Sequence, residues 1–133
     1  MIYLLDTNVC IKLLNKNNIA VVNKLKNHQP EEIYLSTIVQ FELYYGAYKS
    51  SRLEQNLARL ERFFSQFTIV PFDEKSAKIA GKIRTELNKV GTPIGVYDLQ
   101  IASIALANNL ILVTHNIKEF GRIQNLKYED WEV

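Results

Sequence analysis

Short apolar runs separated by helix-like patterns are the feature that most constrains the fold of this chain of 133 residues. Runs of this length, rich in β-branched and aromatic residues, suit strands that are covered on both faces. They occur at 2–5 (IYLL), 33–36 (IYLS), 68–72 (TIVPF) and 109–114 (NLILVT). Because strands that alternate with helices form parallel sheets, we expect an α/β fold of three layers, α/β/α, with a mainly parallel central sheet.

The intervening segments carry the expected helices. Thr37 reads as a helix cap with Gln40 three residues on, and Asp73 reads as the cap of a later helix. Residues 51–67 place Leu53, Leu57, Leu60 and Phe64 at helical spacing, so this face packs either in the core or on another subunit. Gly46, inside the helix after the second strand, suggests close approach of a neighbouring group.

Composition excludes several classes of protein. A hydrophobic fraction of 47% fits one folded domain over residues 1–133, with no linker or repeat to divide it. A net charge of +2 does not by itself announce nucleic-acid binding. No run is long and apolar enough to suggest a membrane span, and no secretory signal is visible. With Cys10 as the single cysteine, read here as a small core residue, we expect a cytoplasmic protein.

Four acidic residues follow the expected strands. Asp6 comes directly after the first strand, Glu42 lies among apolar and aromatic residues in the next helix, Asp98 stands at a helix start, and Glu119 follows the last strand. Capping is an alternative for Asp6 and Asp98, and Asn116 and Glu119 have the spacing of a capping box. Since the carboxyl ends of parallel strands meet at one edge of a sheet, we expect the four acids to converge there.

A cluster of acidic side chains is expected to bind cations. Two carboxylates about 5 Å apart repel by roughly 3 kcal/mol at an effective dielectric near 20, so a cluster needs protons or metal ions. A ligand set made only of oxygen favours Mg²⁺ or Mn²⁺ over zinc. Mg²⁺ held by a few carboxylates keeps open positions for phosphate oxygens, which suits hydrolysis of phosphodiester bonds.

Four segments carry a resemblance to a known family: LLDTNVCI, STIVQFELYYGA, GTPIGVYDLQIASIA and LVTHNIKEFGRI. In this order they resemble the PIN-domain endoribonucleases, specifically the VapC toxins of type II toxin–antitoxin systems, and the similarity runs through to YEDWEV. The resemblance implies a metal-dependent endoribonuclease toxin that inhibits translation, forms homodimers, cuts structured RNA such as tRNA, and is neutralised by a cognate antitoxin.

The resemblance also implies roles for particular residues. Asp6, Glu42 and Asp98 would bind the metal and act in catalysis, with a fourth position in the THNIKEF segment. Many PIN domains have an Asp where this chain has Asn116, which leaves Glu119 as the fourth acid, although Asn116 could still orient a metal-bound water. Thr114 and Asn8 are, with Asn116, candidates for accessory roles.

Most other readings of the same residues are poorly supported. A phosphoaspartyl enzyme of the haloacid dehalogenase type would need an acid at Asn8, and a receiver domain would need an acidic pair near the N-terminus. Nucleophilic catalysis is poorly supported, because His28 and His115 are the only histidines, His28 reads as solvated and His115 as a surface turn residue. The remaining alternative is a catalytically inactive PIN-like module that only binds RNA or protein.

Overall fold

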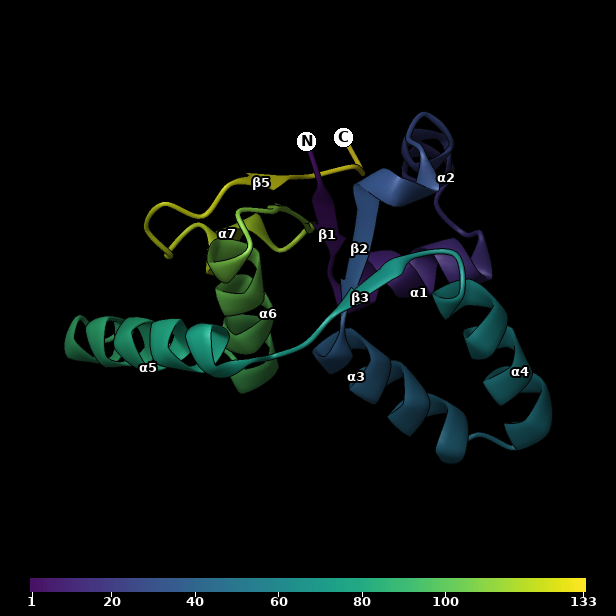
Figure 1. Cartoon of the computed structure of the whole chain (residues 1–133), viewed down its shortest axis with the longest axis horizontal. Helices are drawn as coiled ribbons and strands as arrows, with labels where there is room; N and C mark the ends of the chain where they lie inside the picture. The colour runs from purple at the N-terminus through teal and green to yellow at the C-terminus, as the bar shows by residue number, and fades with distance from the viewer.

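The computed structural model describes all 133 residues and contains one five-stranded sheet. The strands are β1 (Tyr3–Leu5), β2 (Ile33–Ser36), β3 (Thr68–Val70), β4 (Ile111–Val113) and β5 (Tyr128–Glu129). They lie in the order β3-β2-β1-β4-β5, and every neighbouring pair is parallel (Figure 1). The predicted α/β class with a parallel sheet is confirmed.

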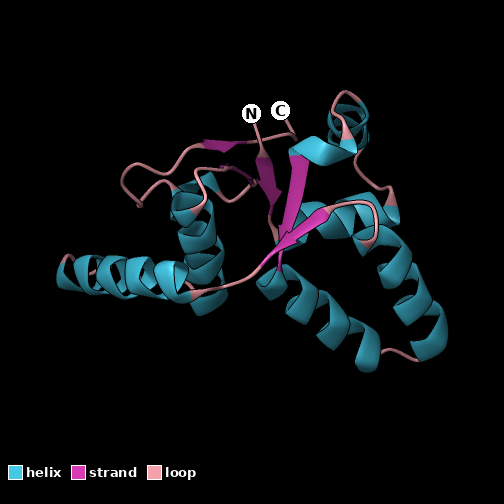
Figure 2. Cartoon of the chain, viewed as in Figure 1, coloured by secondary structure: helices cyan, strands magenta, loops and turns pink.

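Seven α-helices and one short 3₁₀ helix connect the strands. Figure 2 shows the strands between α5 and α6 on one side and the first four helices on the other. The helices are α1 (Thr7–Asn15), α2 (Ile19–Lys26), α3 (Thr37–Tyr48), α4 (Leu53–Phe64), α5 (Glu74–Lys89), α6 (Val96–Ala107) and α7 (Ile117–Phe120), with the 3₁₀ turn at Pro30–Glu32. None of these helices has the length and apolar character needed to cross a membrane.

The strand order creates a switch point between β1 and β4. From β1 the chain builds outward through β2 to β3, and it then returns across the sheet to place β4 on the other side of β1. Right-handed crossovers put the helices before and after this return on opposite faces. In open sheets of this kind ligands bind outside the carboxyl ends of the strands at the switch point. The residues that follow β1 and β4 therefore lie where a site is expected.

The core is built on the central strands. Leu4 of β1 pairs in register with Tyr34 of β2 and Leu112 of β4, and both leucines are fully buried. Burial of both faces explains why these strands are continuous apolar runs instead of alternating ones. Cys10 is also fully buried, as predicted.

The first and second halves of the chain each hold an element that sequence patterns did not predict. Asn18 caps α2 by accepting a hydrogen bond from the Val21 backbone, and β5 is a two-residue strand that exists only through its pairing with β4. A strand this short has no periodicity of its own, so only the tertiary structure defines it.

Two predicted helix starts are wrong by a few residues. Ser36, not Thr37, caps α3, since its hydroxyl accepts a hydrogen bond from the Val39 backbone at 3.1 Å. Helix α6 begins at Val96, so Asp98 lies within its first turn and does not cap it. Asp73 caps α5 as predicted.

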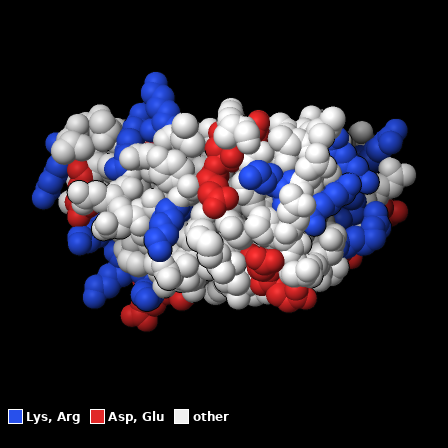
Figure 3. Space-filling model, turned by 90° about the horizontal axis from the view of Figure 1, so that it is seen from above, with Lys and Arg blue, Asp and Glu red and all other residues white.

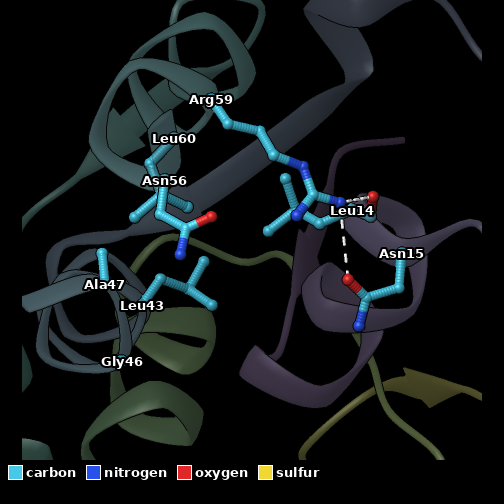
Figure 4. A pocket seen from close by; sticks show the side chains of 8 residues that line it. All are labelled: Leu14, Asn15, Leu43, Gly46, Ala47, Asn56, Arg59 and Leu60. Carbon is cyan, nitrogen blue, oxygen red and sulfur yellow. Dashed lines mark hydrogen bonds between the residues drawn. The ribbon is translucent and has the colours of Figure 1, made fainter. Parts of the chain in front are cut away.

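Helices α1, α3 and α4 line an open pocket of about 310 Å³ (Figure 4). Arg59 of α4 spans it and donates hydrogen bonds to the Leu14 carbonyl and to Asn15 Oδ1. Gly46 borders this space, and a Cβ at that position would meet nothing within 4 Å, so the expected close approach at Gly46 is wrong. The C-terminal half of the apolar face of α4 is a core face, because Leu60, Phe63 and Phe64 are buried there, whereas Leu53 at the start of the helix is exposed.

Candidate active site

Asp6 stands at the end of β1 and is only 4% exposed. Its Oδ1 accepts a hydrogen bond from the Val9 backbone at 2.9 Å, so it also caps α1. Burial raises the pKa of Asp6, and the Thr114 hydroxyl and the Val9 amide offset part of this effect. Asp73 makes the same cap at α5 in an exposed position, and there the hydrogen bonds to Ser76 lower the pKa. The two capping aspartates differ because one of them is enclosed at the site.

Glu42 projects from the second turn of α3 and is fixed by a neighbour of Asp6. The Thr7 hydroxyl donates a hydrogen bond to Glu42 Oε1 at 2.6 Å. This bond joins the first turn of α1 to α3 and turns the carboxylate of Glu42 toward the end of β1. The orientation of Glu42 thus depends on Thr7, a residue that the sequence analysis did not single out.

Asp98 and Glu119 meet at Gly95, the residue that precedes α6. The backbone N–H of Gly95 donates to Glu119 Oε1 at 2.6 Å. A Cβ at Gly95 would lie 3.6 Å from Glu119 Oε1 and 3.8 Å from Asp98 Oδ2, so both carboxylates face the same small space. Any side chain at this position would enter the space between the two acids.

Asn116 supports Glu119 in the turn after β4. Its amide Nδ2 donates to Glu119 Oε2 at 2.9 Å, and its Oδ1 accepts from the Glu119 backbone at 3.4 Å. The backbone N–H of Asn116 donates in turn to the buried Thr114 hydroxyl at 3.0 Å. The capping role suggested by the spacing is therefore confirmed for Asn116, while both oxygens of Glu119 are held in place.

The four acids influence one another across an open space. Burial, together with the negative charges of Glu119, Asp6 and Glu42, raises the pKa of Asp98 to about 6. No three of these four bring ligand oxygens within 4.8 Å of one another; the group that does so consists of His115, Asp130 and Glu132. Glu119, Asp6 and Glu42 are therefore near enough to Asp98 to raise its pKa, but the oxygens of the four acids do not close on each other.

The C-terminal segment borders this space, and sequence patterns did not identify its role. His115 Nδ1 lies 2.9 Å from Asp130 Oδ2, and Lys12 forms an ion pair with Glu132. The reading of His28 as solvated is wrong, because its ring stacks on Trp131 with centroids 5.3 Å apart. The pattern YEDWEV offers no periodic signal, and only packing of Trp131 brings its acids to the site.

Repulsion among the acids predicts a pH-dependent stability. The folded pKa of Asp98, about 6, lies above its ordinary value of 3.8, so the folded protein binds a proton that the unfolded chain releases at lower pH. The free energy of unfolding gains this contribution in acid and loses it as pH rises through about 6. In chelator, Asp98→Asn should therefore melt at a higher temperature than the wild type at pH 7.5 and lose this advantage near pH 4. Thermal melts at both pH values check this, and identical melting temperatures throughout would contradict it.

The fourth position can be tested by comparing two substitutions. Glu119→Gln keeps the hydrogen-bonding capacity but removes the charge, and it should reduce RNA cleavage by about tenfold or more if Glu119 acts as a ligand. Asn116→Ala removes the amide that holds Glu119 Oε2 and should have a smaller effect. Steady-state rates on one RNA substrate make the comparison. If Asn116→Ala loses most of its cleavage rate while Glu119→Gln cleaves at nearly the wild-type rate, the fourth site position belongs to Asn116 and not to Glu119.

Fold and site place the chain among α/β domains with an acidic site at the switch point of a parallel sheet. Within this class, the family model for the PIN domain matches residues 3–126. Ribonuclease VapC2 of Rickettsia felis is 46% identical over 99% of each chain, and the tRNA(fMet)-specific endonuclease VapC of Shigella flexneri is 40% identical over 97% of each. The chain belongs to the PIN domain family and, within it, to the VapC proteins.

Solved structures agree with this relationship. VapBC2 from Rickettsia felis, bound to a DNA fragment from its promoter, has a chain 45% identical to this one with a TM-score of 0.91, covering 98% of this chain and 99% of that one. DNA-bound VapBC from Salmonella typhimurium matches with 37% identity and a TM-score of 0.92, covering 98% of each chain. The fold and strand order described above are thus those of VapC proteins.

Proposed function

We propose that this chain is a metal-dependent endoribonuclease that acts as the toxin of a toxin–antitoxin pair. The observation that carries the proposal is the gathering of Asp6, Glu42, Asp98 and Glu119 around one space at the switch point of the sheet. Relatives named as ribonucleases and as a tRNA-specific endonuclease support an RNA substrate, and we extend this to structured RNA such as tRNA.

The donor set fits a hard divalent cation. All four groups are carboxylates, and a ligand set of oxygen atoms favours Mg²⁺ or Mn²⁺. Burial is the largest cause of the raised pKa of Asp98, and the negative charges of Glu119, Asp6 and Glu42 that add to it are charges that a cation would neutralise. Asp6, Glu42, Asp98 and Glu119 are the residues that would hold the ion. When bound, such an ion supplies Lewis-acid polarisation of a phosphoryl oxygen and lowers the pKa of water.

The surrounding residues orient three of these acids. The Val9 amide and the Thr114 hydroxyl stabilise the ionised form of Asp6. Thr7 orients Glu42, and the Gly95 and Asn116 donors fix the two oxygens of Glu119. Positioning of this kind lets a site act without reorganising during the reaction.

Charged side chains are unevenly distributed over the surface in spite of the small net charge. Figure 3, which looks down on the edge of the sheet where both chain termini lie, shows Lys and Arg side chains gathered toward both ends of this face, with acidic side chains between them. Because β1 and β2 begin at this edge, these charges lie away from the acidic site at the carboxyl ends of the strands. The acids themselves repel phosphate unless cations are present, which makes binding and cleavage depend on the metal.

An antitoxin partner is part of the proposal. The solved relatives are VapBC complexes, and the acidic site offers a place for a cationic side chain. An Arg guanidinium can bind a carboxylate pair through two hydrogen bonds and would compete there with metal. We also keep the predicted homodimer; Phe41, Tyr45 and Tyr48, spaced along α3, are exposed and could form its contact face.

The experiment that tests the proposal combines expression with cleavage. Expression of the chain alone should arrest growth and produce discrete RNA fragments, and co-expression with the protein encoded beside it should restore growth and yield a complex. Asp6→Asn serves as the inactive control. Normal growth without RNA fragments would overturn the proposal in favour of an inactive binding module. Fragments without any rescue or complex would overturn the toxin–antitoxin part alone.

A further inference from the structure

A polar cavity of about 490 Å³ opens beside Asp6 and shares Asp6 and Asn116 with the site described above. This volume lies within the range of about 300 to 1,000 Å³ that small-molecule pockets occupy. Its walls come from both sides of the switch point, since α1 and the turn after it face the turn after β4. The lining residues are Asp6, Asn8, Ile11, Lys12, Asn17, His115 and Asn116.

Two of the three lining amides are free. The side chains of Asn8 and Asn17 take part in no hydrogen bond within the chain, whereas Asn116 is held by Glu119. Each amide presents a donor and an acceptor, the combination that pairs with the edge of a nucleobase. The cavity therefore offers unpaired hydrogen-bonding groups of both kinds.

His115 supplies a flat surface in a fixed orientation. Its Nδ1 lies 2.9 Å from Asp130 Oδ2, and because a carboxylate can only accept, Nδ1 carries the proton in this contact. The side chain remains 57% exposed, so the ring is held by one edge while much of it stays accessible. Rings of this kind stack on unpaired bases of RNA.

The charges of the cavity favour a neutral group over a phosphate. Lys12, the one lysine in the lining, is already paired with Glu132, and Asp6 and Asp130 add negative charge nearby. A phosphate would be repelled by these carboxylates, whereas an uncharged base would not. Ile11, which is 38% exposed, adds an apolar contact on the same wall.

We infer that the cavity lined by Asn8, Asn17 and His115 is a nucleotide subsite that accepts one unpaired base of the RNA next to the scissile bond. The inference rests on the proposed function and adds to it a determinant of specificity. Asp130 is then a positioning residue for the ring of His115. Substrates would be cut where a base can leave its stack and enter this cavity.

The test uses the full chain and one RNA oligonucleotide whose cut position has been mapped. An abasic nucleotide is placed in turn at each position flanking the cut, and kcat/KM is measured. At one position the wild type should lose about tenfold to a hundredfold, as expected for a stacked base. Asn17→Ala should lose about fivefold to tenfold on the intact RNA, the effect of one hydrogen bond.

The decisive comparison is between the loss of kcat/KM that Asn17→Ala causes on the intact RNA and the loss that it causes on the abasic RNA. Asn17→Ala should lose little more when the abasic RNA is used, because the same contact is already missing. Asn27→Ala, an exposed Asn without side-chain hydrogen bonds at the end of α2, is the matched control and should behave as the wild type. Equal rates with every abasic RNA, or fully multiplicative losses, would overturn the subsite while leaving the nuclease intact. A wild type that cuts no RNA would overturn both the subsite and the proposed function.

Discussion

Asp6→Asn should lower the rate of RNA cleavage by about a hundredfold or more, because losing about 3 kcal/mol of transition-state stabilisation gives a factor of this size. Asp6 is buried at the switch point, and its negative charge raises the pKa of Asp98, so Asp6 is part of the acidic site. Asn caps helices as well as Asp does, so the cap on the Val9 amide should persist. Initial rates under saturating metal, with circular dichroism to confirm folding, make the measurement.

Asp73→Asn is the matched control for this prediction. Asp73 also follows a strand and caps a helix, accepting a hydrogen bond from the Ser76 backbone at 3.0 Å. It lies at the surface and is absent from the causes that raise the pKa of Asp98. Its replacement should leave cleavage within about twofold of the wild type, as expected for a surface change. Equal losses in Asp6→Asn and Asp73→Asn would show that capping, and not the charge at the site, explains the effect.

Trp131→Ala should lower the free energy of unfolding by about 3 to 5 kcal/mol, the usual cost of removing a buried aromatic side chain. Trp131 is 1% exposed, stacks on His28, contacts Tyr3 and donates a hydrogen bond from Nε1 to Glu129 Oε1 at 3.1 Å. The melting temperature should fall by roughly 10 °C or more. Urea titration and thermal melts measure both quantities.

The same substitution should also weaken cleavage. Trp131 lies between Asp130 and Glu132, which contact His115 and Lys12 at the edge of the site. Val133→Ala is the control, because Val133 is 88% exposed and follows the same segment. A Trp131→Ala variant that melts within about 2 °C of the wild type would contradict the anchoring role assigned to Trp131.

Sequence patterns predicted those parts of the fold that depend on local periodicity. The buried run at 33–36 coincides with β2, and Asp73 caps α5, since both signals are contained in neighbouring residues. Helix α2 and strand β5 were missed for different reasons. Helix α2 spans only Ile19–Lys26, and β5 is defined by pairing with β4.

The candidate site also combines features that the sequence predicts with features that only the tertiary structure defines. The positions of Asp6 and Glu119 after strands allowed their convergence to be predicted from topology alone. The contacts that orient them could not be predicted, because Thr7 reaches Glu42 across 35 residues and Gly95 reaches Glu119 across 24. The ion pair of Lys12 with Glu132 joins residues 120 apart and leaves no pattern in the sequence.

The central claim, that four carboxylates make this chain a metal-dependent endoribonuclease, is tested most directly by cleaving one RNA with and without divalent cations and identifying the new ends. The two histidines do not form an acid–base pair, since His28 packs on Trp131 and His115 is held by Asp130. Attack by water with departure of the 3′ oxygen then predicts fragments with a 5′-phosphate and a 3′-hydroxyl, formed with Mg²⁺ or Mn²⁺ and abolished by chelator. Full activity in excess chelator, or a 2′,3′-cyclic phosphate on the products, would contradict it.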